Sequence, residues 1–231
     1  MFVPYFDITY LIFSLPAILI GVIASLLLNY WTKKYDRVIN INQINGIDLT
    51  EKTAKKFNLD LRLQVEDALL SDNYNPLSNT LSLSHNSAYN SSITSVGITA
   101  HELGHAIQHQ QRSPLIMLRT AIVPVVSFGS SLGYLLLIVG IIIGLTQLAW
   151  VGIILFSGTT IFSLVTLPVE IDASRRGLAL LKEQQVLFPH EFAGVKKVLS
   201  AAALTYIAAT LQSLGSLLYF IFRVQGLSKR D

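Results

Sequence analysis

Four long apolar runs constrain the fold of this chain more than any other feature. They cover residues 10–30, 120–145, 148–168 and 198–222. Each is close to the length of about 20 residues that an α-helix needs to cross a hydrocarbon core about 30 Å thick. A chain inside lipid satisfies its backbone polar groups only as a helix or a closed barrel. The sequence therefore predicts a mainly α-helical, polytopic membrane protein with about four transmembrane helices.

The distribution of charge agrees with this topology. Only 13% of the 231 residues are charged, whereas a soluble domain is about a quarter charged. Residues 32–119 carry nine of the 17 Lys and Arg and eight of the 14 Asp and Glu, and residues 169–197 carry five and four more. We therefore expect one membrane domain, in which a water-soluble segment follows the first span and a shorter polar segment follows the third.

The first apolar run is predicted to be an uncleaved anchor. No positive charge precedes it, whereas Lys33, Lys34 and Arg37 follow it directly. The positive-inside rule then places the N-terminus outside and residues 32–119 in the cytoplasm. A short uncharged turn joins the second and third runs, which predicts a helical hairpin. The fourth run is less apolar, so it could pack inside a bundle or lie partly re-entrant.

The composition also excludes several kinds of chemistry. The chain has no cysteine, so disulfides, thiolate metal sites and cysteine nucleophiles are excluded, and a metal would use His, Asp or Glu. The net charge of +3 is a weak sign of nucleic-acid binding, because the positive charges are interleaved with acids and form no basic run. We expect the lipid bilayer as a partner and no nucleic acid.

The segment between the first and second spans has the pattern of a small α+β unit. Residues 48–57 begin with a capping signature, Asp48 with Glu51, that predicts a short helix. Two alternating stretches predict half-buried strands, and a turn and a second helix accompany them. The strands are expected at 61–65 and 80–84, the turn at 73–76 and the second helix at 92–110.

The second helix carries an H-E-x-x-H motif made by His101, Glu102 and His105. Residues i and i+4 of a helix share one face, so both imidazoles can reach one zinc ion. Glu102 is then placed to take a proton from a zinc-bound water and to pass it to the leaving amine. The motif predicts a Zn²⁺-dependent enzyme that hydrolyses peptide bonds. The alternative is a solvated helix whose histidines are accidental.

A zinc peptidase needs a third protein ligand, and Glu170 is the strongest candidate. A carboxylate at the end of an apolar span is costly unless it is paired or coordinates a metal. The two-span hairpin returns the chain to its starting side, so Glu170 reaches the compartment of the H-E-x-x-H helix. Two alternatives stay open. Asp172 is either the ligand itself or a residue that orients a ligand histidine, and Glu170 could instead pair with Arg175 or Arg176.

The remaining histidines are less suited to bind the metal. His109 is too far along a continuous helix to share the ion, so we expect it to cap the helix or to lie behind the ligands. His85 and His190 are expected at the surface. A donor for the tetrahedral oxyanion is also required, and the candidates are His109, Arg175 and Tyr206.

These motifs resemble those of the bacterial membrane neutral zinc metallopeptidases. The shared features are a Tyr-x-Pro turn with an Asn-Thr-Leu-x-Leu-Ser strand, then A-H-E-x-G-H-A-x-Q-H, then L-P-V-E-x-D-A-S-R-R, at residues 74–84, 100–109 and 167–176. The order of helix, strand, strand and helix is similar to the small half-domain of many zinc peptidases. The resemblance implies a gluzincin-like peptidase with His101, His105 and Glu170 as zinc ligands and Glu102 as general base.

A more distant similarity connects the chain with the CAAX-type and heat-shock membrane zinc proteases. Those enzymes place an Asp four residues after the ligand Glu. This chain has Ser174 at that position and Asp172 two residues earlier. Whether Asp172 orients a ligand is therefore open.

The predicted function is an endopeptidase of the bacterial cytoplasmic membrane whose site faces the cytoplasm and whose substrate is a peptide or a membrane protein. The strand at 80–84 is expected to offer its backbone edge to an extended substrate. The alternative is a non-proteolytic scaffold or regulatory subunit with a structural zinc site, which would not need Glu102. Intramembrane proteolysis fits less well, because Ser, Thr and Asn are frequent before His101. A homo-oligomer or a membrane partner is compatible with the sequence.

Overall fold

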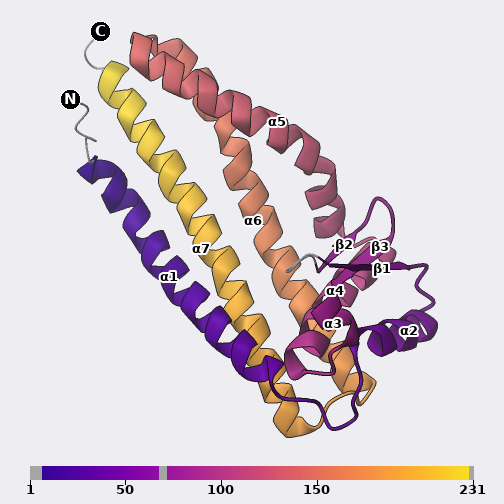
Figure 1. The fold of residues 1–231 in the computed structure, drawn as a ribbon. Helices are drawn as coiled ribbons and strands as arrows, with labels where there is room; N and C mark the ends of the chain where they lie inside the picture. The colour runs from indigo at the N-terminus through magenta and orange to yellow at the C-terminus, as the bar shows by residue number, and fades with distance from the viewer. Residues whose placement is uncertain (1–6, 68–71, 229–231) are drawn as a thin grey trace.

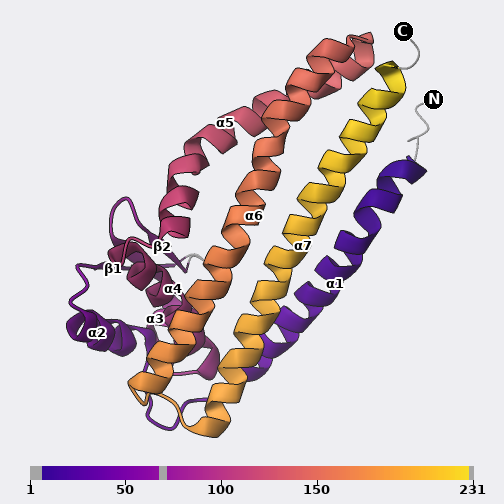
Figure 2. The ribbon, with the colours of Figure 1, turned by 180° about the vertical axis from the view of Figure 1, so that it is seen from behind.

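The computed structural model describes residues 7–67 and 72–228, which form a bundle of long helices with a small sheet at one end (Figures 1 and 2). The elements in chain order are α1 (Ile8–Asp36), α2 (Gly46–Phe57), β1 (Arg62–Glu66), β2 (Asn73–Asn75), β3 (Thr80–Ser84), α3 (His85–Tyr89), α4 (Ile93–Gln110), α5 (Pro114–Ile143), α6 (Thr146–Glu183) and α7 (Pro189–Ser228). Among them, α1, α5, α6 and α7 are long and apolar enough to cross a membrane. The predicted class, a mainly α-helical polytopic membrane protein, is confirmed.

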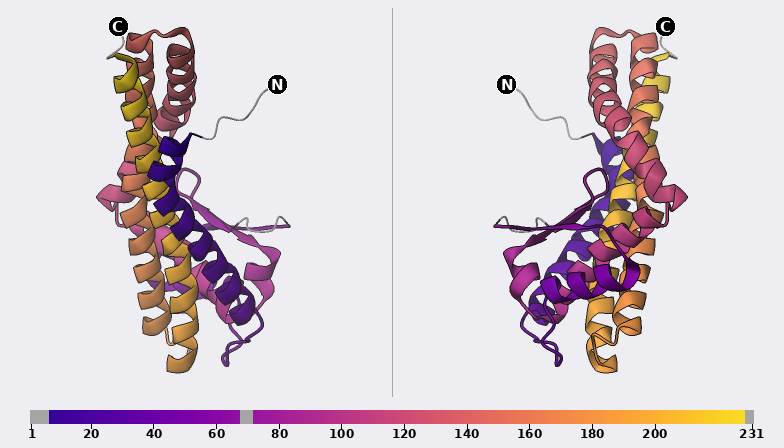
Figure 3. Two further views of the ribbon diagram at one scale, coloured as in Figure 1. Left: turned by 90° about the vertical axis from the view of Figure 1, so that its left-hand side faces the viewer. Right: turned by 90° about the vertical axis from the view of Figure 1, so that its right-hand side faces the viewer.

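The four long helices follow one another across the bundle. α1 packs along α7, α7 packs against α6, and α6 packs against α5. The first turn of α1 and the last turn of α7 both lie toward the end of the bundle away from the sheet (Figures 1 and 3). α7 is one continuous helix, so the fourth apolar run spans the bundle and is not re-entrant.

Glycines close the α5–α6 hairpin at the end far from the sheet. A Cβ atom on Gly133, Gly140 or Gly152 would collide with the backbone of the opposite helix. Small residues of this kind let membrane helices approach each other closely. The two helices are therefore held together over the half of the hairpin that adjoins their connecting turn.

The other half of α5 bends away from α6, as Figures 1 and 2 show. Pro124 lies inside α5, where it lacks an N–H group for the helical hydrogen bond and its ring crowds the preceding turn. We attribute the bend to this residue. Consequently the first turns of α5 reach the sheet at a distance from the axis of α6.

The three-stranded sheet has the order β1-β3-β2, with β1 parallel and β2 antiparallel to β3. All five residues of β3 are buried. The prediction that the strand at 80–84 is half-buried and offers a free edge is therefore wrong, because β3 is the central strand and both of its edges are paired. The outer strands of the sheet are β1 and β2, and β2 forms within the predicted turn at 73–76.

The short helix α2 begins two residues earlier than predicted. Its capping box consists of Asn45 and Asp48, not Asp48 and Glu51. The Asn45 side chain accepts a hydrogen bond of 2.9 Å from the Asp48 N–H, and the Asp48 carboxylate accepts one of 3.2 Å from the Asn45 N–H. Each of the two side chains thus accepts a hydrogen bond from the backbone N–H of the other residue, so both N–H groups have a partner.

α6 continues without interruption from the third span to Glu183. The first part of the polar segment predicted at 169–197 is therefore helical and belongs to the same rigid element as the span. α4 crosses this part of α6 at two glycines. Gly104 lies against the backbone of Ala173, and a Cβ atom on Gly177 would lie only 2.6 Å from the carbonyl oxygen of Ala100.

We predict that Gly177→Ala lowers the free energy of unfolding by about 1–3 kcal/mol, because the added methyl group forces α4 and α6 apart. The measurement is the midpoint of thermal unfolding of the detergent-purified protein. Gly129→Ala is the matched control, since a Cβ atom at that helical position meets nothing within 4 Å. Equal midpoints for the two variants would contradict the tight crossing.

Candidate metal centre

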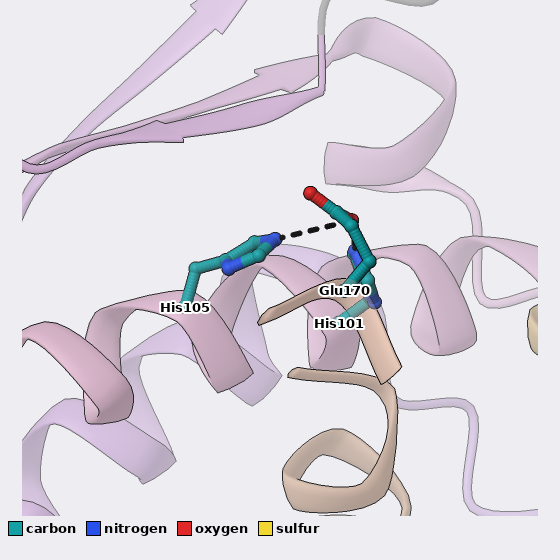
Figure 4. A group of neighbouring side chains, drawn as sticks. All are labelled: His101, His105 and Glu170. Carbon is teal, nitrogen blue, oxygen red and sulfur yellow. Dashed lines mark hydrogen bonds and ion pairs between the residues drawn. The ribbon is translucent and has the colours of Figure 1, made fainter. Parts of the chain in front are cut away.

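Three candidate metal ligands converge where α4 crosses α6. His101 and His105 lie one turn apart on α4, and Glu170 lies on α6. Figure 4 shows their side chains pointing toward one another. One ligand atom of each residue lies within 4.8 Å of the other two. The Nε2 atoms of His101 and His105 are 3.2 and 3.5 Å from Oε2 of Glu170.

These separations fit a zinc ion. Zinc bonds to His nitrogen and carboxylate oxygen are about 2.0–2.2 Å long, so two ligand atoms of a tetrahedral site lie about 3.3–3.6 Å apart. His105 is 6% exposed and Glu170 is 2% exposed. A buried carboxylate needs compensating charge, and a dication held jointly with two imidazoles would supply it. The donor set His₂Glu also leaves a fourth position open, as catalytic zinc sites do.

Each histidine is held through its other ring nitrogen. Nδ1 of His101 lies 3.0 Å from Oγ of Ser174, and Nδ1 of His105 lies 3.0 Å from Oε1 of Gln108. An amide oxygen can only accept, so Nδ1 of His105 carries the proton and its Nε2 is free to bind a metal. Contacts of this kind set the orientation of ligand histidines. The sequence analysis noted Ser174 only as the residue at the position of the Asp in the CAAX-type and heat-shock proteases, and it did not identify Gln108, although each lies one helical turn after a candidate ligand.

Gln108 connects His105 with Asp172. Its Nε2 donates to the Val169 carbonyl oxygen at 3.0 Å and to Oδ2 of Asp172 at 2.7 Å. Because both partners are acceptors, the orientation of the amide group is determined. Asp172 also accepts a bond of 2.6 Å from Nε of Arg176. Asp172 therefore lies behind the cluster and reaches His105 only through Gln108.

Arg119, in the first turns of α5, pairs with Glu170 across a distance of 3.1 Å from Nη1 to Oε1. The carboxylate thus directs Oε2 toward the histidines and Oε1 toward the guanidinium. The sequence analysis considered Arg175 and Arg176 for this pairing. In the structure Arg175 is exposed, and Arg176 contacts Asp172. One feature of the sequence points to Arg119: it is the last charged residue before the second apolar run.

Glu102 lies beside the three candidate ligands. Its Oε2 accepts a hydrogen bond of 2.9 Å from the backbone N–H of Tyr74 in β2. Burial raises the pKa of the Glu102 carboxyl to about 7, although the neighbouring His101 acts in the opposite direction. A carboxyl group with such a pKa can both accept and release a proton near neutral pH.

The other predicted residues occupy different places. His109 contacts Tyr74, with Nδ1 2.9 Å from the phenolic oxygen. Tyr206 of α7 interacts with the Glu170 carboxylate, so it is the oxyanion candidate that lies at the cluster. His85 and His190 are exposed, as expected.

The fold and the cluster together define a class of protein: a polytopic membrane protein in which an H-E-x-x-H helix crosses a spanning helix that supplies a buried Glu. The chain belongs to a family of neutral zinc metallopeptidases, since residues 10–225 match the family described as "Putative neutral zinc metallopeptidase". It is 38% identical over 208 residues to "Putative membrane protease YugP" of Bacillus subtilis (strain 168), which covers 86% of this chain and 92% of that protein. No solved structure matches the chain.

We predict that Gln108→Ala weakens zinc binding by about 10- to 100-fold, because His105 loses the partner that orients its ring. Competition with a zinc-binding dye on the purified protein measures the affinity. Gln110→Ala is the matched control, because Gln110 is exposed on the same helix and donates to backbone oxygens of Phe57 and Asn58. The two variants are expected to differ in zinc affinity. Equal affinities would contradict the role of Gln108 in orienting His105.

Proposed function

We propose that this protein is a zinc-dependent endopeptidase of the bacterial cytoplasmic membrane. The proposal depends on one observation: His101, His105 and Glu170 present three ligand atoms to a common point beside the carboxylate of Glu102. A zinc ion held by these three residues would polarise the scissile carbonyl and lower the pKa of a bound water. The membership of a zinc metallopeptidase family supports the same reading.

In this proposal Glu102 is the general base. The Tyr74 N–H holds Oε2 of Glu102 at 2.9 Å and leaves Oε1 for the proton of the attacking water. The same carboxyl then returns the proton to the leaving amine, which completes hydrolysis without a covalent intermediate. A structural metal site would have no use for a carboxylate at this place.

Arg119 and Tyr206 have supporting roles in the proposal. Arg119 neutralises Glu170 at Oε1, so that Oε2 keeps its direction toward the histidines. Tyr206 provides a hydroxyl on the α7 side of the cluster, where it could donate to the oxyanion that forms during attack. Both residues act beside the ligands and would not replace any of them.

The edge that would hold an extended substrate is that of β2. β3 is excluded because both of its edges are paired. The Tyr74 N–H of β2 donates to Glu102 on α4, so the outer edge of β2 adjoins the helix that carries the H-E-x-x-H motif. A substrate segment that lies along β2 would present its peptide bond to the cluster.

The site is proposed to face the cytoplasm. Lys33 and Lys34 end α1 at the sheet end of the bundle, and Lys196 and Lys197 lie in the first turns of α7 at the same end. Nζ of Lys197 lies 4.5 Å from the centre of the Trp31 ring. An excess of Lys and Arg at a membrane boundary is typical of the cytoplasmic side, and Trp is frequent at either boundary.

Three purified proteins test the function: wild type, Glu102→Gln and Glu170→Ala. Wild type is expected to bind about one zinc per chain and to cleave casein or a membrane-protein reporter. Glu102→Gln is expected to keep its zinc and to lose at least about 100-fold of the cleavage rate. Glu170→Ala is expected to lose both, because the third ligand is gone. Metal analysis and peptide mapping by mass spectrometry give the two measurements.

His85→Ala serves as the control, since His85 is exposed and packs only on Tyr89 among the described ring contacts. It should match wild type in both measurements. If wild type binds zinc but cleaves no more substrate than Glu102→Gln, the scaffold function with a structural zinc site replaces the peptidase.

A further inference from the structure

A cavity of about 660 Å³ opens directly beside the candidate metal centre. Residues 74–77 at the β2–β3 turn form one wall, and residues 116–124 of α5 contribute to another. His105 of α4 and Phe162 of α6 also line the cavity. Its size is within the range of about 300–1,000 Å³ that is usual for ligand pockets. Whatever occupies this space is therefore in reach of the candidate ligands.

The bend of α5 explains why the cavity exists. The glycines of the α5–α6 hairpin keep the two helices in contact on the far side of Pro124, and a Cβ atom on Gly158 would still lie only 3.6 Å from a methyl carbon of Val126. Toward the sheet the two helices separate, and Val123, Pro124 and Phe162 are among the residues that line the space between them.

The cavity extends from the membrane surface toward the bilayer interior. Arg119 and Glu170 lie just outside the predicted spans 120–145 and 148–168, at the same end of the bundle. Phe162 precedes Glu170 by eight residues along α6, which corresponds to about 12 Å at 1.5 Å per residue. The polar end of the cavity thus belongs to the surface, and the apolar end belongs to the depth of the hydrocarbon.

The mouth of the cavity is apolar and exposed. Leu77, at the β2–β3 turn, is 85% exposed, and Met117 and Val123 on α5 are 44% and 42% exposed. All three line the cavity. Apolar side chains that protrude beside a membrane-spanning helix mark a membrane or ligand contact. The opening therefore faces sideways, toward lipid, between the β2–β3 turn and α5.

We propose that this cavity receives large apolar side chains of an integral membrane protein substrate, at the point where the end of a transmembrane helix unwinds near the membrane surface. The inference rests on the proposed function and names its substrate class. The occupant is a peptide segment because His105 and Tyr74 line the same space, so the chain that fills it brings a peptide bond to the cluster. Arg119 at the polar end disfavours a cationic side chain there.

A reporter series in proteoliposomes tests the preference. A single-span reporter carries Leu, Phe, Gly or Lys next to the scissile bond, which is first mapped by mass spectrometry. We expect kcat/KM to be at least about tenfold higher for Leu and Phe than for Gly and Lys, which is the discrimination that an apolar pocket supplies. Equal values for all four reporters would overturn the inference and leave the peptidase intact.

A variant that fills the cavity makes the test specific. Ala121 lines the cavity from α5, so Ala121→Phe should lower the cleavage of the Leu and Phe reporters at least about tenfold and spare the Gly reporter. Val125→Phe is the matched control: Val125 lies one turn further along α5, is 72% exposed and is outside the lining. Equal losses in both variants would also overturn the inference.

A crosslinking measurement separates the inference from the proposed function. In Glu102→Gln protein, a photoreactive benzoylphenylalanine at Leu77 should crosslink to the Leu reporter, whereas the same group at Val125 should not. A crosslink at Leu77 without any cleavage by wild type would support the docking of membrane segments and refute the peptidase. Crosslinks at Leu77 to lipid alone would overturn the inference, because the cavity would then be an acyl-chain site.

Discussion

The close crossing of α4 and α6 is the interaction on which the rest of the site depends. Gly104 and Gly177 bring the two helix backbones into contact, because neither position has room for a Cβ atom. The candidate ligands lie within one or two turns of this contact, so their separation is set by helix packing and not by a loop. Ligand atoms whose positions are set by helix packing are preorganised, which lowers the cost of binding an ion.

The crossing also brings together a buried polar network. Without the crossing, the buried carboxylate of this network would lack its partners on α4. Glu170 is almost fully buried, and an isolated buried carboxylate is costly. Arg119 from α5 and the two histidines from α4 offset that cost, while Gln108 connects the histidine side of the cluster to Asp172. One long apolar helix thus supplies the buried carboxylate of the candidate metal centre.

Pro124 connects this site with the bilayer. Because the close glycine contacts between α5 and α6 lie beyond the bend, the half of the hairpin near the sheet leaves a space whose lining includes His105 and Phe162. The same helix therefore contributes Arg119 to the candidate metal centre and the wall of the cavity to its surroundings.

The sequence by itself determined the features that depend on local spacing or on the thickness of a bilayer. The spans follow from runs of about 20 apolar residues, and the pairing of His101 with His105 follows from helical periodicity. The prediction that Glu170 lies on the same side of the membrane as the two histidines follows from the two spans between them. Only the tertiary structure decided which strand is central and which side chains lie behind the ligands. Strand order, the partners Ser174 and Arg119, and the link from Gln108 to Asp172 depend on contacts between distant segments. No local pattern specifies how two helices cross or where a bent helix opens a cavity.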